Sequence, residues 1–300
     1  MRKMEMLLSV FKTNHQVKCA GAIGLLIFAF LLFSNSVSHA MEPLDNYAAP
    51  PGMYFLDYPI YITGDSIKDA DGNTTVDDID LAVSLNIFRF AWYDKTLFNN
   101  TSLVTLVMPY GRTELFDNHD TGAGDWELSF WHWLIDDPVN KTYLVVGSYF
   151  NIPFGDYDVD NPASMGINVW QARPAIGLAK AIGQFSMELS LKYNFYEKNS
   201  ETDTKSGNEL RIESNIGYFI TERVGAYLHF NAIFGDDKEV GGETVDDSGI
   251  TKYQAGPAIT IRPSGKVPFM PAIAFQYLAD FEVENAAATR TILGRFVWKF

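Results

Sequence analysis

Hydrophobic and polar residues alternate with a period of two along the chain beyond residue 50. In one clear stretch, 184–196, every second position is apolar: Phe185, Met187, Leu189, Leu191, Tyr193 and Phe195. The positions between them are polar and include Glu188 and Lys192. Because successive side chains of a β-strand point to opposite faces, the stretch predicts a strand with one apolar and one polar face. Two opposite charges on the polar face indicate water there and argue against the dry core of a sandwich.

About twelve segments follow this pattern, and no window of residues 41–300 supports helical periodicity. The segments lie near 53–62, 80–92, 101–110, 124–134, 142–152, 167–179, 184–196, 208–219, 223–234, 250–262, 267–279 and 287–300. A tilted strand needs about nine to eleven residues to cross a bilayer, whereas strands of soluble proteins have about five or six. The pattern therefore predicts an all-β fold, a transmembrane antiparallel up-and-down β-barrel of about 12 strands.

The connections between these segments alternate in length, most clearly in the C-terminal half. Tight turns are expected at 180–183, 220–222 and 263–266, and long acidic loops at 63–79, 111–123, 153–166, 197–207 and 235–249. Barrels of the bacterial outer membrane have short periplasmic turns and longer external loops. We therefore expect an even number of strands and both termini in the periplasm.

The first 40 residues have the features of a secretory signal peptide. Four basic residues come before an apolar run at 20–33: Arg2, Lys3, Lys12 and Lys18. The run has about fourteen residues, fewer than the roughly twenty of a membrane-spanning helix. It leads to Ser38-His39-Ala40, a small-x-small site of the kind that signal peptidase cleaves. This predicts a signal peptide at 1–40, a periplasmic segment at 41–52 and the barrel at 53–300.

Charge and cysteine content exclude some partners and chemistries. The chain has 23 Lys and Arg against 37 Asp and Glu, a net charge of −14. Removal of 1–40 takes away four bases and one acid, which leaves 19 − 36 = −17. Nucleic acid as a partner is not expected, because its phosphates require a basic surface. The single cysteine, Cys19, lies in the leader, so residues 41–300 have no disulfide or thiol chemistry.

The C-terminal residues carry the sharpest local signal. The chain ends in Phe300, with Trp298 and Phe296 on the same face of the last predicted strand. A terminal Phe with apolar residues at alternate positions resembles the C-terminal signature of outer-membrane barrels. The resemblance implies recognition by the barrel-assembly machinery.

Four positions depart from the alternation. Arg89 shares its parity with Leu85 and Ile87, which predicts either a β-bulge or an arginine that reaches the membrane interface. Pro174, Pro257 and Pro271 lie in predicted strands, where each removes a hydrogen bond of the ladder. A closed barrel has no free edge for them, so bulges are expected there.

The polar faces of the strands are expected to line the inside of the barrel. The predicted lumen-facing residues are Asp125, Glu127, Arg173, Glu188, Lys192, Glu209, Arg211, Glu213, His229, Lys252 and Arg262, together with Arg295 and Lys299. Such charges either line a water-filled pore or pair across a narrow barrel and fill it. Both outcomes stay open, because barrels of eight strands are filled by side chains and barrels of sixteen leave a channel. No long insertion suggests a plug domain.

Catalysis is not expected. Residues 41–300 contain three histidines, His119, His132 and His229, with no Gly-x-Ser-x-Gly motif and no serine in a nucleophile context near a histidine. His119 lies in a predicted external loop.

One loop has a weak resemblance to a calcium site. From Asp69 to Asp80, residues with side-chain oxygens occupy positions 1, 3, 5, 7, 9 and 12, as in an EF-hand loop, and Asp71 and Asn73 are the second and third of them. However, Gly72 stands at position 4 instead of 6, and position 12 is Asp instead of Glu. An acidic external loop without a metal is the alternative, and no other cofactor is expected.

Several short motifs resemble those of the meta-pathway phenol-degradation outer-membrane proteins. They are Pro50-Pro51-Gly52-Met53-Tyr54, Gly122-Ala123-Gly124-Asp125-Trp126, Asn168-Val169-Trp170 before Pro174, and the strand pair around 207–209 and Tyr218. Residues 151–158 resemble the Pro-Thr-Gly-x-Tyr-Asp segment of these proteins, with Phe154 in place of Thr. The resemblance covers nearly all of 48–300. It implies a barrel that transports hydrophobic, often aromatic, compounds, and it assigns no substrate residues.

Taken together, the sequence favours a channel of the bacterial outer membrane for the passive uptake of small hydrophobic or aromatic solutes. Tyr196, Tyr227 and Phe154 are the aromatic residues expected near the lumen or its outer mouth. Expected partners are outer-membrane lipid, lipopolysaccharide and the barrel-assembly machinery. The alternative is a closed structural or adhesive barrel that acts through its acidic external loops.

Overall fold

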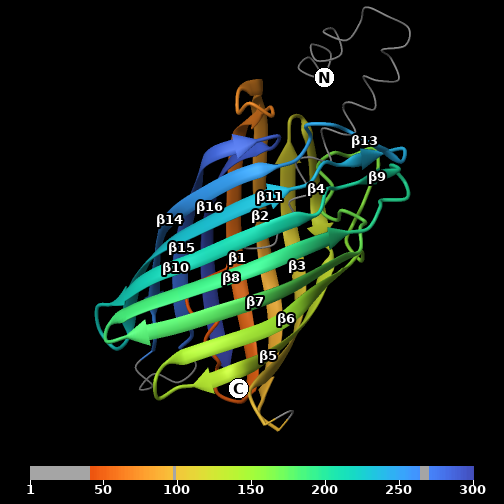
Figure 1. Ribbon diagram of the computed structural model, residues 1–300. Coiled ribbons are helices and arrows are strands. Elements are labelled where there is room, and N and C mark those ends of the chain that lie inside the picture. The colour runs from red at the N-terminus through yellow and green to blue at the C-terminus, as the bar shows by residue number, and fades with distance from the viewer. Residues whose placement is uncertain (1–40, 97–98, 264–269) are drawn as a thin grey trace, which may run out of the picture.

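The computed structural model describes residues 41–96, 99–263 and 270–300, and in this part the chain forms one closed β-barrel (Figure 1). Its strands are β1 (Gly52–Lys68), β2 (Thr74–Asp94), β3 (Ser102–Leu115), β5 (Trp126–Asp137), β6 (Thr142–Ile152), β7 (Gln171–Ile182), β8 (Phe185–Tyr196), β10 (Glu209–Phe219), β11 (Val224–Gly235), β14 (Thr251–Ile261), β15 (Ala272–Glu284) and β16 (Ala287–Lys299). Each pairs in antiparallel fashion with its neighbours in sequence, and β1 pairs with β16. The predicted fold class and the number of twelve strands are confirmed. The predicted signal peptide lies outside the described residues.

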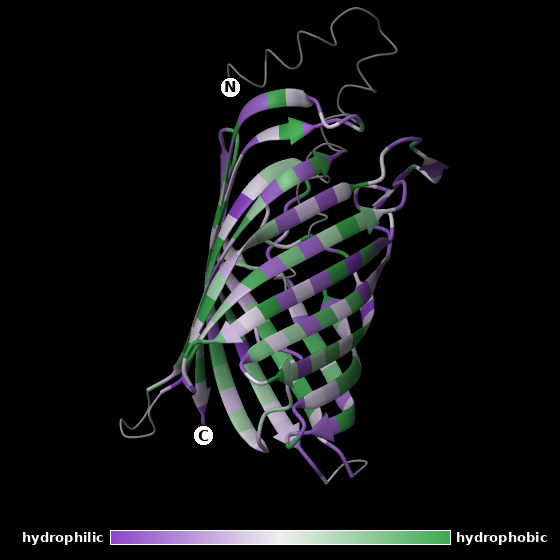
Figure 2. Ribbon diagram, turned by 60° about the vertical axis from the view of Figure 1, so that its left-hand side comes forward, coloured by the Kyte–Doolittle hydropathy of each residue, from purple (hydrophilic) through white to green (hydrophobic). Residues whose placement is uncertain are grey.

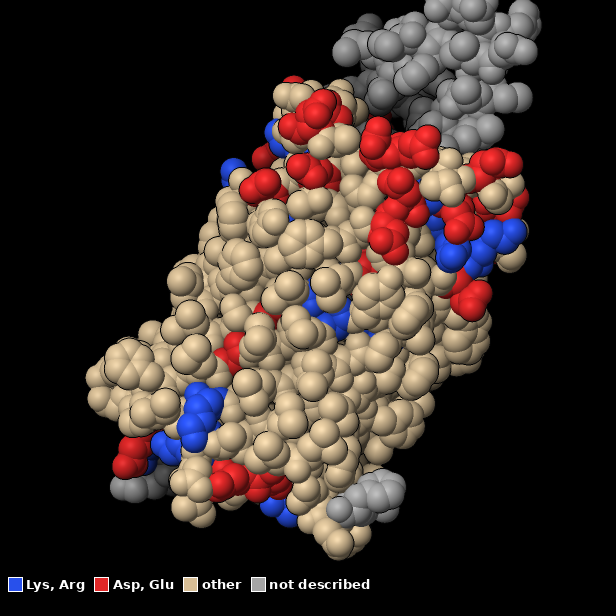
Figure 3. All heavy atoms as spheres, viewed as in Figure 1, with Lys and Arg blue, Asp and Glu red and all other residues tan. Residues whose placement is uncertain are grey.

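Four shorter strands extend the barrel at one end. β4 (Asn118–Ala123) folds back on the outer half of β3, whereas β5 pairs with its other half. β9 (Thr204–Lys205), β12 (Glu239–Val240) and β13 (Glu243–Thr244) form a small sheet among the loops. This end also carries the long connections, and Figure 3 shows Asp and Glu side chains gathered around it. By the loop-length rule it is the external end.

The outer face of the barrel wall is apolar. Along β8, Phe185, Met187 and Leu189 are exposed, whereas the polar residues between them are buried. Figure 2 shows the same alternation on the neighbouring strands. An exposed apolar surface of this extent is the lipid-facing belt of a membrane barrel. No helix in the described part of the chain has the length and hydropathy to cross a bilayer.

The end opposite the long loops holds the short turns and the C-terminus. The backbone N–H of Phe300 donates to the carbonyl of Met53, so the last residue lies beside the start of β1. The tight turns at 183–184 and 220–223 lie between strands that start and end here. This is the periplasmic end by the same rule.

The first external connection is shorter than predicted. Instead of a long loop at 63–79, β1 continues to Lys68 and β2 begins at Thr74, so only five residues connect them. A register shift after Gly64 lets the two strands continue beyond the other strands of the barrel. The acidic composition of 63–79 predicted a loop, but it is also compatible with strands here, because strands that project into water need no apolar face.

The bulges predicted at two prolines are absent. Pro174 pairs with Ser148 on one side, and the register of β7 with β8 is the same before and after it. Pro257 likewise pairs with Leu228, and β14 keeps its register with β15 across it. Each proline interrupts the ladder on one side only, because it lacks a single N–H group. Pro271 lies before β15 and is outside the strand.

Candidate functional site: the barrel lumen

One half of the inner wall is apolar. On β2, Leu81, Val83, Leu85 and Ile87 are buried and pack with residues of β1, β3 and β16. Arg89 continues the same face and is also buried, and β1 and β2 keep one register from Gly52 to Gly64. The predicted bulge or interfacial position of Arg89 is therefore wrong. The apolar side chains of this parity face the lumen, and so does the arginine.

The other half of the inner wall is polar. Eleven of the thirteen residues predicted to face the lumen are buried inside the barrel, on β5, β7, β8, β10, β11, β14 and β16 or directly before β5: Asp125, Glu127, Arg173, Glu188, Lys192, Glu209, Arg211, Glu213, His229, Lys252 and Arg295. Lys299, the last residue of β16, is exposed. Arg262 is also exposed, because it follows the last residue of β14 at the periplasmic end. Its guanidinium lies over the ring of Phe219.

Many of these charges are paired with one another. Salt bridges join Lys192 to Glu213 at 2.6 Å and Arg211 to Glu209 at 2.7 Å. Farther round the wall, Lys252 lies 2.9 Å from Asp280, and Arg173 lies 3.6 Å from Glu127. The pairs neutralise the buried charge of the polar wall, which would be costly for single ions. Pairing within the wall leaves the space between the two walls open.

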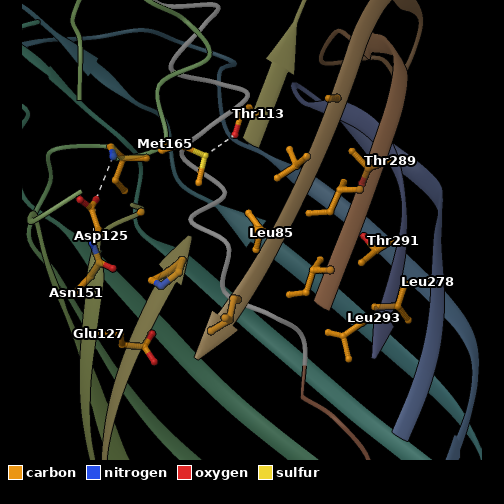
Figure 4. A pocket seen from close by; sticks show the side chains of 18 of the residues that line it. Leu85, Thr113, Asp125, Glu127, Asn151, Met165, Leu278, Thr289, Thr291 and Leu293 are labelled. Atoms are coloured by element: carbon orange, nitrogen blue, oxygen red, sulfur yellow. Dashed lines mark hydrogen bonds between the residues drawn. The ribbon is translucent and has the colours of Figure 1, made fainter. Parts of the chain in front are cut away.

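A cavity of about 180 Å³ lies between the two walls in the external half of the lumen. Figure 4 shows Leu85, Leu278 and Leu293 on one side, opposite Asp125, Glu127 and Asn151 on the other. Thr289 and Thr291 add hydroxyl groups to the apolar side. The cavity can therefore hold an apolar body and at the same time offer hydrogen bonds to a polar substituent.

Asp125 positions the loop between β6 and β7, residues 153–170, which forms the external cover of this cavity. It stands at the break between β4 and β5, and its Oδ1 accepts a hydrogen bond from the N–H of Gly155 at 2.9 Å. Its Oδ2 accepts from the N–H of Ile167 at 3.0 Å. Ile167 and Met165 line the cavity, and Met165 also contacts the hydroxyl of Thr113. This buried carboxylate thus binds the loop between β6 and β7 at two points over the lumen, and Asp120 adds a third contact by accepting from the N–H of Met165.

The periplasmic half of the lumen is filled by the chain's own N-terminal segment, residues 41–49. Leu44 and Asn46 donate their backbone N–H groups to Glu188 of β8, at 2.6 and 3.0 Å. The indole N–H of Trp133 donates to the carbonyl of Asn46 at 3.0 Å. Residues 41–52 were predicted to lie in the periplasm, but the structure places most of them inside the barrel. The polar wall supplies the partners that this backbone would otherwise find in water.

A cation on the last strand holds the same segment. Arg295 of β16 lies 2.7 Å from Glu42 and 2.8 Å from Asp45, and it also donates to the carbonyl of Pro43. Glu42 is completely buried. Sequence reasoning missed this plug because it searched for a long insertion. The available signal was a short stretch with two acids, Glu42 and Asp45, directly before a barrel with inward arginines.

The three aromatic residues predicted near the lumen or its outer mouth do not line the cavity. Tyr196 and Tyr227 are buried, and neither lines the cavity. Phe154 is exposed on the external loop and makes an edge contact with Trp126. Leu, Ile and Val side chains of β1, β2 and β16 form the apolar wall in their place.

The histidines are dispersed. His229 Nδ1 lies 3.1 Å from Asn215 inside the barrel, and His119 belongs to β4 at the external end. His132 Nδ1 lies 3.0 Å from Ser102 Oγ, a contact that the sequence did not predict. The parity of β3 and β5 directs this pair outward, and neither residue lines the cavity.

The four calcium candidates are not brought together. Asp69 Oδ1 accepts hydrogen bonds from the N–H groups of Asp71 and Asn73 in the turn between β1 and β2. Asp80 lies within β2, roughly 20 Å farther along at about 3.3 Å per residue. In the described part of the chain, no group of three or more His, Cys, Asp or Glu residues is arranged to hold a metal ion.

Comparison with known proteins identifies the family. The model of the family described as "Putative MetA-pathway of phenol degradation" matches residues 64–296. The chain belongs to this family. The resemblance drawn from the short sequence motifs is thereby confirmed, and no curated protein matches the chain.

Solved structures show the same architecture. An outer membrane channel from Pseudomonas putida F1 superposes with a TM-score of 0.78 and 18% identity, over 87% of this chain and 100% of that one. The translocator domain of the autotransporter NalP from Neisseria meningitidis gives 0.49 and 12%, over 94% and 98%. A FadL homologue from Pseudomonas aeruginosa gives 0.43 and 9%, over 83% and 89%. The fold is that of bacterial outer-membrane barrels, and its apolar belt belongs in the outer membrane.

Proposed function

We propose that this protein is an outer-membrane channel through which small hydrophobic or aromatic solutes enter passively. The observation that carries the proposal is the cavity between an apolar and a polar wall. Its volume of about 180 Å³ is close to that of apolar protein cavities of about 150 Å³ that bind benzene. One aromatic ring against Leu85 and Leu293 would therefore fill it, and a hydroxyl substituent would find partners across the lumen.

The family supports the same class of solute. Its description refers to phenol degradation, and a phenol combines an apolar ring with one hydroxyl group. A binding site with an apolar body and a few placed polar groups is the usual form of a small-molecule site. Thr289, Thr291 and Asn151 line the cavity and would bind that hydroxyl.

The plug at residues 41–49 sets a condition on transport. It occupies the periplasmic half of the lumen, below the cavity, and is held by Glu188 and Arg295. A solute that enters from outside thus reaches a binding site first. It passes on when the segment shifts or leaves.

Binding of 4-fluorophenol to the detergent-solubilised protein, followed by fluorine NMR, tests this function. We expect saturable binding that is lost in Leu85→Trp, because the larger side chain fills the cavity. Phe90→Trp is the matched control, since Phe90 lies on the outward face of the same strand. Absence of saturable binding to the unmodified protein, or equal binding by Leu85→Trp, contradicts the proposal.

The second candidate is a closed barrel that acts through its acidic external loops. The well-anchored plug is the observation that favours it, because Glu188 and Arg295 bind this segment directly. Planar-bilayer conductance separates the candidates. A channel should conduct ions once residues 41–49 are deleted. A barrel that shows no conductance after the deletion, and that binds no aromatic probe, supports the second candidate.

A further inference from the structure

The first residue of the plug is bound on several sides inside the lumen. The backbone nitrogen of Met41 lies 3.1 Å from Oε2 of Glu213, and both residues are buried. The amide of Asn215 donates to the carbonyl of Met41. The sulfur of Met41 accepts from Ser190 at 3.0 Å and from Asn46 at 3.2 Å. Met41 thus occupies a fitted site on the polar wall.

The charges around the plug favour one more cation. The acids that touch the segment or belong to it are Glu42, Asp45, Glu188 and Glu213. The cations available to them are Lys192, Arg295 and Arg89, which lines the same part of the lumen. Arg211 also lies near Glu213, but it is paired with Glu209. Four acids therefore face three bases. An uncompensated buried carboxylate is costly, so a fourth positive charge at this place stabilises the assembly.

The sequence offers a source for that charge. Ser38-His39-Ala40 has the small-x-small pattern of a signal-peptidase site, and cleavage after Ala40 would make Met41 the first residue. Water adds across the Ala40–Met41 peptide bond, the C–N bond breaks, and the leader departs with a new carboxylate. The released amine takes up a proton, because a free α-amino group is mostly an ammonium ion at neutral pH.

We propose that this processing creates the ligand that closes the barrel: the α-ammonium group of Met41 forms an ion pair with Glu213 in the lumen. Oε2 of Glu213 then binds two cations, Met41 and Lys192. An uncleaved chain has a neutral amide at the same nitrogen and must also lead residues 1–40 out of the lumen. Closure of the barrel is thus coupled to maturation, whatever solute the channel carries.

The first test uses protein isolated from outer membranes. Intact mass should identify Met41 as the first residue. A reagent selective for α-amines should then react at least about tenfold more slowly with the folded protein than with the urea-unfolded chain. Glu213→Gln should remove most of this protection, whereas Glu127→Gln removes a buried carboxylate that does not touch the plug and should keep it. A different first residue, or an amine that reacts equally fast in both states, overturns the proposal.

A second test keeps the proposal falsifiable if Glu213→Gln does not assemble. Because residue 41 is itself methionine, the chain refolded from cytoplasmic inclusion bodies can begin at the natural residue. It is compared with a chain that carries Gly-Ser-Gly before Met41, and planar-bilayer conductance is recorded for both. The extension should raise the open fraction about tenfold or more, because it moves the ammonium away from Glu213. Equal conductance of the two chains contradicts the ion pair, even where both bind 4-fluorophenol.

Discussion

Arg295 on the last strand and Glu42 near the start of the described chain form an ion pair of 2.7 Å inside the barrel. The two residues are 253 positions apart, and the contact fastens the plug to the wall. Glu42 has no exposed surface, so its charge depends on this partner.

Replacement of Arg295 should open the channel. Arg295→Gln leaves the fully buried Glu42 and the partly buried Asp45 without their cation, and breaking a buried pair such as Arg295–Glu42 costs about 3–5 kcal/mol. We expect the plug to leave the lumen and the planar-bilayer conductance to rise. Arg112→Gln is the control, because its pair with Glu114 is exposed and worth at most about 1 kcal/mol. Unchanged conductance in Arg295→Gln would show that this pair does not hold the plug.

The orientation of β2 can be tested with single cysteines, since residues 41–300 contain none. Leu85→Cys should react with a small water-soluble thiol reagent, because Leu85 lines the cavity. Phe90→Cys should be protected in liposomes, because Phe90 faces lipid. Reversed reactivity would show that the apolar face of β2 points outward.

Asp125 should control the external cover. Asp125→Ala removes the acceptor of the Gly155 and Ile167 N–H groups, and each buried group left unpaired costs about 1–3 kcal/mol. We expect faster amide hydrogen exchange across 153–170 with little change in the strands. Asp156→Ala, which removes an acceptor on the exposed side of the same loop, is the comparison. If the amides of 153–170 exchange as slowly in Asp125→Ala as in the unmodified protein, Asp125 does not anchor this loop.

Loss of Phe300 should impair assembly more than stability. Phe300 is 77% exposed, and its backbone N–H bond to Met53 can be kept in Phe300→Ala. We expect the folded fraction in outer membranes to fall several-fold, while refolding in detergent and the urea midpoint stay the same. An equal loss in both settings would assign Phe300 a purely structural role and remove the argument for the assembly machinery.

Lys238 in the loop between β11 and β14 should make that loop sensitive to pH. Burial lowers the pKa of Lys238 to about 8, and the nearby Asp237 carboxylate only partly opposes this. Between about pH 8 and the unfolded value near 10.5, the unfolded loop binds more protons, so folding of the loop becomes more favourable as pH rises. Protection factors for residues 236–249 should rise over this range, and Lys238→Met should abolish the trend. A flat profile in the unmodified protein contradicts it.

At the prolines and at Arg89, the local sequence pattern did not predict the observed structure. A proline in a strand predicts a missing hydrogen bond, which Pro174 and Pro257 show, but not whether the neighbouring strand shifts in response. Arg89 was interpreted against the assumption that every lumen-facing position is polar. The assumption holds for β8 and β10 and fails for β2, because the lumen has two unlike walls.

The barrel itself was determined by the sequence. Alternation is a property of neighbouring residues, so the sequences of β8, β10 and β11 each predict one apolar and one polar face without reference to the rest of the chain. Only the tertiary structure decided which face of β2 points inward, because a strand with apolar residues on both faces has no parity signal. It also decided that residues 41–49 enter the lumen, since Glu188 and Leu178, two partners of Asn46, lie more than 130 positions away and no local pattern encodes them. The local sequence pattern therefore predicts the strands of the barrel wall, whereas the position of residues 41–49 inside the barrel depends on contacts between distant residues.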